Sequence, residues 1–366
     1  MDRSVSILVV SGTYPPDIGG SEASLGTACR ELARRGHRVV VLADDRRPAR
    51  EVIEGVQVWG VKPAEVGDAM DSLHKKERFH IVLTQLIFSR EALRWASAVG
   101  LPSVYFVRNA EMRVDLSVSI PHTPTRLVAS SRFLARRIQA QWRRESDVVF
   151  PLVDRLAVLP DARRGDDVLM INPIVLKGGA VFRSLALRHP ERRFLAVQCW
   201  TGLRRRGPGG GWDPRQWSLM AEAHDDPTVH PPEEPELGDL PNVEVLPPKP
   251  DMRPIYGRAR VLLFPAQWEE AFGRTVLEAL LCGVPVVAAA VGGLLETGLS
   301  RGGVVLPRGA DPELWSRALL MLDDPAVYAA ASEGAREDSA WYNLDKQVDK
   351  LEAVLAECLR RKGQPW

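Results

Sequence analysis

Two glutamates, Glu270 and Glu278, have seven residues between them, and a glycine, Gly273, lies in this interval. The apolar spacing predicts a short helix over 275–282, so the glycine comes just before the helix N-terminus. Unpaired N–H groups and the positive end of the helix dipole favour an anion there, and glycine allows close approach because it has no Cβ. A carboxylate beside such a site is suited to accept hydrogen bonds from sugar hydroxyls. The segment therefore predicts a phosphate site next to a sugar site.

The elements that must hold this segment in place alternate between strands and helices along the chain. Apolar runs in the first half predict strands at 5–10, 38–43, 80–83, 103–107 and 126–129. Those in the second half predict strands at 168–171, 194–197, 243–246, 261–264, 286–289 and 304–306. Helical spacing separates most of these runs, which is typical of α/β domains with parallel, doubly wound sheets. We therefore expect two Rossmann-like domains that face a central cleft.

The division between the two halves is expected in a polar stretch rich in Arg and Asp, 155–166. This places an N-terminal domain at 1–160 and a second domain at 161–338. The remaining segment, 339–366, begins with the apolar spacing of a long amphipathic helix. A stretch at 201–241, rich in Gly, Pro and Glu, interrupts the alternation, and loops of this length inside a domain are either functional lids or disordered.

Composition and charge narrow the class of protein. The 366 residues include 48 Lys and Arg against 47 Asp and Glu, a net charge of +1, so no bulk electrostatic attraction to nucleic acid is expected. Four widely spaced cysteines, without a Cys-x-x-Cys pair, are expected to be free thiols in a reducing cytoplasm. The sequence contains no run of about 18 apolar residues, so no membrane span is expected. The first apolar run is also too short for a signal peptide.

Several motifs, which follow one another in the right order, resemble family 4 retaining glycosyltransferases of the GT-B fold. They are Tyr14-Pro-Pro-Asp-Ile-Gly-Gly-Ser-Glu22, Lys177-Gly178, Glu270-x7-Glu278, and the pair Gly283-Val-Pro-Val-Val287 and Gly292-Gly-Leu-Leu-Glu296. A lone Glu-x7-Glu is a weak signal, but this resemblance extends over nearly the whole chain. It implies a GT-B fold whose last helix crosses back to the first domain. It also implies transfer of a sugar, with retention, from a nucleoside-diphosphate sugar to a lipid-linked or small-molecule acceptor such as a natural product.

The resemblance also implies roles for individual residues. Glu278 would hold the ribose hydroxyls, and Glu270 with the backbone at Phe272-Gly273 would hold hydroxyls of the transferred sugar. Lys177 and the backbone at Thr275-Val276 would neutralise the diphosphate. The candidate catalytic residues are Lys177, Glu270 and Arg108. The candidate donor-binding residues are Gly19, Gly20, Asn172, Phe272, Gly273, Arg274, Thr275, Val276 and Glu278.

The expected mechanism follows from the movement of charge. Breaking the anomeric C–O bond leaves positive charge on the sugar and negative charge on the departing diphosphate. Cations and N–H groups fixed on that diphosphate therefore contribute most in the transition state. The resemblance implies substitution on the same face, with the leaving phosphate helping to take the acceptor proton, so neither a protein nucleophile nor a cofactor is expected. No divalent metal is expected, because the sequence has no Asp-x-Asp.

Two positions depart from the family pattern. Asn172 stands where the family often has an arginine, so a second phosphate cation must come from elsewhere, with Arg204–Arg206 as candidates. Arg108-Asn109 follows a strand at whose end the family tends to place a histidine facing the sugar. Arg108 is therefore either a contact for an acidic or polar acceptor or a structural or salt-bridged residue. Gly19-Gly20 is likewise either an approach for the donor phosphates or a plain turn.

Alternatives to the transferase function stay open at the level of sequence. They are a pseudo-glycosyltransferase, another GT-B enzyme that acts on nucleotide sugars, and a catalytically silent protein that binds sugar nucleotides. The Arg-rich segment 131–144 has apolar residues at helical spacing. A packed helix with a solvated basic face is favoured there over peripheral contact with an anionic membrane. The Arg- and Pro-rich composition indicates a bacterial source of high GC content.

Overall fold

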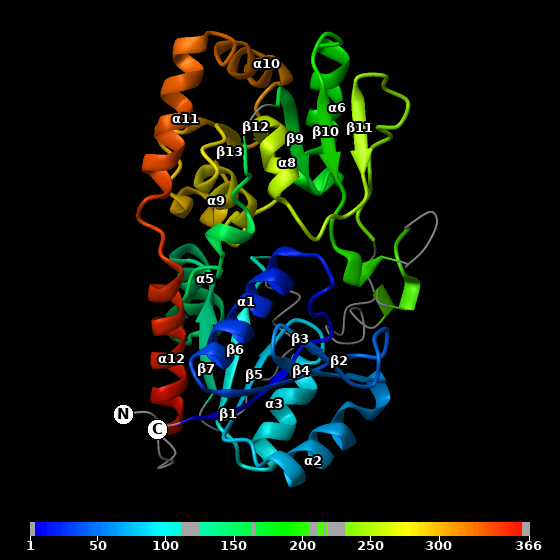
Figure 1. Ribbon diagram of the computed structural model, residues 1–366, viewed down its shortest axis with the longest axis vertical. Coiled ribbons are helices and arrows are strands. Elements are labelled where there is room, and N and C mark those ends of the chain that lie inside the picture. Colours follow the sequence, from blue (N-terminus) through cyan, green and yellow to red (C-terminus); the bar gives the residue numbers. More distant parts are fainter. Residues whose placement is uncertain are drawn as a thin grey trace.

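The computed structural model describes residues 4–110, 125–162, 165–204, 211–215, 217–218 and 231–360. Two sheets lie one above the other, and helices cover both faces of each (Figure 1). The predicted division at 160/161 lies between the last strand of the lower sheet and the first strand of the upper one. The expectation of two Rossmann-like domains is confirmed.

The lower sheet has eight strands in the order β3-β4-β2-β1-β5-β6-β7-β8. The strands are β1 (Ser6–Val10), β2 (Arg38–Asp44), β3 (Glu51–Ile53), β4 (Val56–Val61), β5 (Ile81–Gln85), β6 (Ser103–Val107), β7 (Thr125–Ala129) and β8 (Asp147–Val148). Its helices are α1 (Gly20–Arg34), α2 (Val66–Glu77), α3 (Ser89–Ala98) and α5 (Arg132–Trp142). The pairing is parallel except at one edge, where β3 runs antiparallel to β4. The expectation of a wholly parallel sheet is wrong for this short hairpin.

The upper sheet has six strands in the order β11-β10-β9-β12-β13-β14, and all of its pairs are parallel. The strands are β9 (Asp167–Ile171), β10 (Phe194–Val197), β11 (Val243–Leu246), β12 (Ala259–Phe264), β13 (Val286–Ala289) and β14 (Gly303–Leu306). Its helices are α6 (Gly179–Arg188), α8 (Arg253–Arg258), α9 (Arg274–Leu281), α10 (Pro312–Met321) and α11 (Pro325–Ser339). Short 3₁₀ turns are η1 (Pro63–Glu65), η2 (Arg155–Ala157), η3 (Val175–Lys177), η4 (Thr201–Leu203) and η5 (Gly292–Thr297).

The first strand shows why the strands of these sheets are continuous apolar runs in the sequence. Ile7 and Val9 point to one face of the sheet, in a core shared with α1 and with the last helix, α12 (Leu344–Arg360). Leu8 and Val10 point to the other face, in a core shared with α2 and α3. Because both faces are covered, every residue of β1 is buried.

The last helix lies against the first domain although it follows the second in sequence. Val348, Leu351 and Leu355 of α12 are buried in the core of the lower sheet. In Figure 1 the helix runs down the side of that domain. On its exposed side, Arg35 contacts Asp349 and Glu352 at 2.6 Å. The chain therefore passes between the domains twice, after β8 and again before α12.

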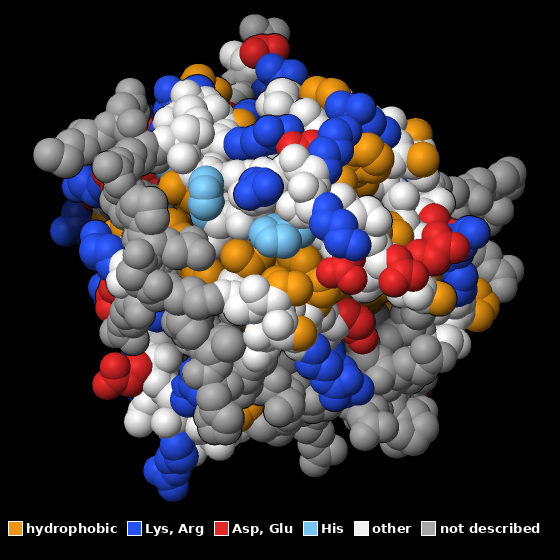
Figure 2. Space-filling model, turned by 90° about the horizontal axis from the view of Figure 1, so that it is seen from below, with side chains coloured by type: hydrophobic (Ala, Val, Ile, Leu, Met, Phe, Trp, Pro, Cys, Tyr) orange, Lys and Arg blue, Asp and Glu red, His pale blue; other side chains and the backbone are white. Residues whose placement is uncertain are grey.

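The surface of the first domain mixes side chains of different kinds. Figure 2, seen from below, shows Lys and Arg among apolar, Asp and Glu side chains. In the Arg-rich helix α5, Leu134 and Ile138 are fully buried against the sheet, so these two apolar side chains are packed inside the protein. Within the part of the chain that the structure describes, no helix combines the length and apolar character that crossing a membrane requires.

Candidate active site

The strand order of each sheet places the site. The order reverses between β1 and β5 in the lower sheet and between β9 and β12 in the upper one. In parallel sheets, ligands bind beyond the carboxyl ends of the strands at such a reversal. Gly19 and Gly20 follow β1, Lys177 follows β9, and Glu270 follows β12. The predicted site residues from both domains thus lie on facing edges.

Lys177 and Glu270 form an ion pair in the second domain. The Lys177 Nζ donates to Glu270 Oε1 at 2.9 Å, although the residues are 93 positions apart. Gly178, at φ +89°, ends the turn that carries the lysine, and a Cβ there would lie 2.1 Å from the Pro265 carbonyl oxygen. The glycine therefore lets the lysine turn pack directly against the loop that carries the glutamate.

Aromatic rings surround the ammonium group of this lysine. Lys177 Nζ lies 5.3 Å from the ring centre of Trp268 and 5.7 Å from those of Trp200 and Phe264. Such distances are typical of cation–π contacts, which attract a cation to the ring face. The Trp268 indole N–H also donates to Glu270 Oε1 at 2.6 Å. Trp268 thus orients both partners of the ion pair.

Glu278 is buried and accepts a hydrogen bond at each carboxylate oxygen. The Tyr256 hydroxyl, from α8, donates to Oε2 at 2.7 Å, and the Arg274 Nε donates to Oε1 at 2.6 Å. Burial raises the pKa of Tyr256, and the neighbouring Glu278 carboxylate raises it further. The tyrosine therefore stays a neutral donor. Glu278 is held rigidly at the start of α9.

The N-terminus of α9 begins after Gly273, which has φ +90°. The Val276 N–H donates to the Gly273 carbonyl at 3.0 Å, whereas the Thr275 N–H has no partner among the described residues. The expected role of both amides toward a phosphate stays a prediction. Phe272 is buried, and its ring centre lies 5.3 Å from that of Phe150, in the segment that leaves the first domain.

The glycines after β1 meet the second domain. The Arg274 Nη1 donates to the Gly20 carbonyl at 3.0 Å, which joins α9 to the first turn of α1. A Cβ on Gly19 would lie 2.1 Å from Oε2 of Glu22. Thr13 donates to the other oxygen of that carboxylate at 2.7 Å. A side chain at position 19 would therefore require the carboxylate of Glu22 to move.

Arg108 lies on the first domain and is deeply buried, with 9% exposed surface. Its Nε donates to Gln85 Oε1 at 2.7 Å, and its guanidinium carbon lies 4.2 Å from the Phe106 ring centre. Burial lowers the pKa of Arg108 to about 9, with Glu22 acting to raise it and Arg274 to lower it further. Within the described residues it forms no ion pair, so they do not support the salt-bridged alternative, and the structural alternative stays open.

The residues considered for a second phosphate cation are placed less favourably. Asn172 adopts φ +59° and is buried, and neither polar atom of its side chain has a partner. Arg204 is ion-paired with Glu234 and lies 3.9 Å from the Trp212 ring centre, so its charge is already compensated. The other two candidates, Arg205 and Arg206, lie outside the described residues.

Sequence reasoning missed contacts that close the cleft. The Ile18 N–H donates to the Thr201 hydroxyl at 2.5 Å, and the Thr201 N–H donates to the Ile18 carbonyl at 3.1 Å. Arg215 and Asp45 form a further ion pair at 2.8 Å between the domains. No local pattern signals these pairs. Trp268 could have been found, because it stands two residues before Glu270 in the same motif.

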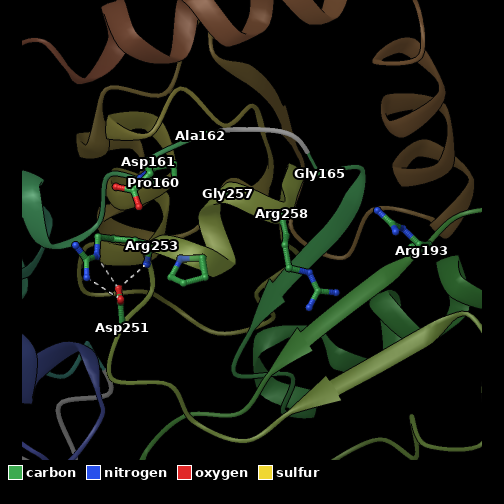
Figure 3. Close-up of a pocket in the computed structure, with 10 residues that line it drawn as sticks. Pro160, Asp161, Ala162, Gly165, Arg193, Asp251, Arg253, Gly257 and Arg258 are labelled. Atoms are coloured by element: carbon green, nitrogen blue, oxygen red, sulfur yellow. Dashed lines mark hydrogen bonds and ion pairs between the residues drawn. The ribbon is translucent and has the colours of Figure 1, made fainter.

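A separate cavity of about 580 Å³ lies beside α8, away from the residues described above (Figure 3). Three arginines line it, and each is within ion-pair distance of a carboxylate. Arg253 pairs with Asp251, Arg258 with Asp167 and Glu244, and Arg193 with Asp167. The charges of these three arginines are thus compensated inside the protein.

Comparison with known proteins identifies the family. The model of the glycosyl transferase 4-like domain matches residues 19–159, and that of glycosyl transferases group 1 matches residues 226–324. D-inositol 3-phosphate glycosyltransferase of Saccharomonospora viridis is 28% identical, with 94% of this chain and 90% of that protein covered. The enzyme of the same name from Salinispora arenicola is 37% identical, with 35% of this chain and 29% of that protein covered. Four relatives, this one included, match over only 26% to 46% of their own length.

Solved structures of other proteins match the fold of this chain over almost its entire length. Sucrose-phosphate synthase from Thermosynechococcus elongatus has a TM-score of 0.75 at 18% identity, with 98% of this chain and 100% of that chain covered. Anabaena HepE, solved in complex with UDP-glucose, has a TM-score of 0.71 at 16% identity, with 96% and 100% covered. Since the two family models follow each other in order and span most of both domains, the chain belongs to the family 4 glycosyltransferases of the GT-B fold.

Proposed function

We propose that this chain transfers a sugar from a nucleoside-diphosphate sugar to a small-molecule or lipid-linked acceptor, with retention and without a metal. The observation that carries the proposal is the cluster of Lys177, Glu270 and Glu278 beside the N-terminus of α9, opposite Gly20. It combines a cation and a free N–H for a diphosphate with two carboxylates for hydroxyl groups.

On this proposal the two ends of the donor bind at different carboxylates. Glu278 accepts from the ribose hydroxyls, and Glu270 accepts from the transferred sugar. Lys177 lies next to the departing diphosphate, where its attraction grows as the C–O bond breaks. The leaving phosphate takes the acceptor proton, so the reaction proceeds on one face without a protein nucleophile.

Relatives and neighbours support the donor class. The matched relatives are named D-inositol 3-phosphate glycosyltransferases and come from bacteria, and Anabaena HepE was solved with UDP-glucose. We extend a bacterial origin and a nucleotide-sugar donor to this chain. A cytoplasmic location is part of the proposal, and the four free cysteines, Cys29, Cys199, Cys282 and Cys358, support a reducing compartment.

A thermal-shift panel of UDP, GDP, ADP, TDP and CDP, with and without EDTA, tests the proposal. A ligand at 100 times its dissociation constant stabilises a protein by about 2.7 kcal/mol, which visibly shifts a melting curve. We expect one diphosphate to stand out and EDTA to leave its shift unchanged. If no diphosphate shifts the curve, the donor site is wrong.

A catalytically silent binding protein is the second candidate, because Asn172 carries no charge where the family often has an arginine. Hydrolysis of the donor without an acceptor separates the two functions. A transferase is expected to release the sugar slowly to water, whereas a silent binding protein leaves the donor intact over the same period.

A further inference from the structure

Arg108 differs from the other cations at the cleft. Lys177, Arg274 and Arg204 each lie within ion-pair distance of a carboxylate, and so do Arg46 and Arg47 on the first domain. For Arg108 the described residues offer no carboxylate within 4.0 Å. Among the described residues its Nη2 is buried without a hydrogen-bond partner, and its side chain donates only to the neutral amide of Gln85.

This environment is unfavourable for a guanidinium group on its own. Removing a charge from water without a counter-charge is costly, and an unsatisfied buried donor adds to the cost. Phe106 offers only the face of its ring, at 4.2 Å. A buried donor without a partner requires an explanation, and strongly perturbed charges cluster at functional sites.

The nearest carboxylate does not fill this role. Glu22 acts on Arg108 electrostatically, but it lies beyond ion-pair distance. Its two oxygens already accept hydrogen bonds from Thr13 at 2.7 Å and from Ser21 at 2.9 Å. The carboxylate is thus held by its own neighbours and leaves the Arg108 N–H unsatisfied.

A second guanidinium group approaches from the opposite domain. Gln85, the partner of Arg108, donates from its Nε2 to the Ser21 carbonyl at 3.4 Å, next to the Gly20 carbonyl that Arg274 contacts. The positive charge of Arg274 lowers the pKa of Arg108, so the two charges repel each other. Two of its nitrogens are used, by Glu278 at 2.6 Å and by the Gly20 carbonyl at 3.0 Å. Its Nη2 has no partner among the described residues. An anion near both groups would relieve the repulsion and satisfy both free donors.

We propose that Arg108 and Arg274 together form a site for an anionic group of the substrate, a phosphate or a carboxylate, distinct from the donor diphosphate at Lys177. The inference rests on the proposed function, because it adds a negatively charged substituent to the sugar or to the acceptor. Since one arginine comes from each domain, the site is complete only when the cleft is closed.

Inorganic phosphate is the probe for the site. The melting temperature is measured against phosphate concentration at constant ionic strength for the wild type and the variants Arg108→Gln, Arg108→Lys, Lys177→Gln and Arg193→Gln. The protein is saturated throughout with the diphosphate that the nucleotide panel selects. We expect phosphate to stabilise the wild type, Lys177→Gln and the exposed control Arg193→Gln. Arg108→Gln should bind phosphate about tenfold more weakly or not at all, and Arg108→Lys should keep a reduced response.

A second readout separates this role from a structural one. Without phosphate, Arg108→Gln is expected to melt at the same temperature as the wild type or higher, because the substitution removes an unpaired buried charge. A lower melting temperature together with an unchanged phosphate response would overturn the inference. So would a phosphate response that disappears in Lys177→Gln and persists in Arg108→Gln. Either result leaves the proposed function standing, whereas failure of every diphosphate to bind removes that function first.

Two donors identify which substrate carries the anion. The affinities of UDP-glucose and UDP-glucuronate, or of the equivalent pair on the selected base, are compared in the wild type and in Arg108→Gln. A preference for the glucuronate that Arg108→Gln abolishes places the anion on the sugar. Equal affinities, with a phosphate response that persists while the donor is bound, place it on the acceptor. A glucuronate preference that Arg108→Gln retains contradicts the site.

Discussion

The two sides of the cleft differ in whether a carboxylate pairs with the cations described above. On the second domain, Lys177 and Arg274 are paired with Glu270 and Glu278, so each cation already has its carboxylate. On the first domain, Arg108 is buried with an unsatisfied N–H and a neutral partner. A paired site holds its geometry without a ligand, whereas an unpaired buried charge gains most from one. On the proposed function, the donor side is therefore built before binding, and the other side is completed by its ligand.

The two sides are nevertheless joined at several points. Arg274 reaches from α9 to the Gly20 carbonyl, and Thr201 exchanges hydrogen bonds with Ile18. Tyr342, before the last helix, donates to the Pro151 carbonyl at 2.9 Å. The paired side is therefore connected to the unpaired side mainly by hydrogen bonds between side chains and backbone atoms.

The largest effect is expected at the donor cation. Lys177→Ala should lower turnover by about 10²- to 10³-fold and change donor affinity less, since its partner charge grows as the bond breaks. Steady-state kinetics with the identified donor measure both values. The matched control is Lys62→Ala, whose lysine is exposed and pairs with Glu65 at 3.1 Å. Normal turnover in Lys177→Ala would remove this residue from the reaction.

Donor binding should depend most on the second glutamate. Glu278→Ala removes the proposed acceptor of the ribose hydroxyls and leaves Arg274 without its carboxylate, so the nucleoside-diphosphate affinity should fall about 10- to 100-fold. Isothermal titration measures the affinity, and circular dichroism checks that the variant is folded. Glu337→Ala, at an exposed glutamate that pairs with Arg301, serves as the control. An affinity equal to that of the wild type contradicts the assignment of Glu278.

Variants of the two residues that donate hydrogen bonds to Glu278 distinguish an effect of charge on the ligand from an effect on the position of Glu278. Tyr256→Phe and Arg274→Gln each remove one hydrogen bond to this carboxylate. If Arg274 also contacts the phosphate, Arg274→Gln should weaken the binding of a nucleoside diphosphate more than the binding of the matching nucleoside. Tyr256→Phe should weaken both equally, by about 0.5–1.5 kcal/mol. The same loss pattern in both variants would limit Arg274 to orienting Glu278.

The smallest effect is expected at the junction of the two domains. Glu296, on η5, accepts from the N–H groups of Arg132 and Phe133 at 2.8 and 2.6 Å, so it caps helix α5 of the other domain. Glu296→Ala should lower the free energy of unfolding by about 1 kcal/mol. Urea denaturation measures the change, and Glu333→Ala, at an exposed helical glutamate, is the comparison. Equal stability of the two variants would show that this cap contributes nothing across the domains.

Local patterns predicted most of the fold. Strands such as β6, β10 and β13 have the predicted bounds, because residues buried on both faces leave a continuous apolar run in the sequence. The hairpin of β3 and β4 was missed. Its first strand is short and lies at the edge of the sheet. Val52 is 65% exposed there, so the strand has no run of buried apolar residues that the sequence would show.

The sequence by itself determined the two α/β domains and the segment that carries Glu270, Gly273 and Glu278, because these depend on residues close together in the chain. The tertiary structure alone decided which charges are compensated. The Lys177–Glu270 pair spans 93 positions, Tyr256 reaches Glu278 from another helix, and Arg108 meets Gln85 rather than a carboxylate. Electrostatic energy depends on distance in space and on burial, and spacing along the chain specifies neither between distant segments.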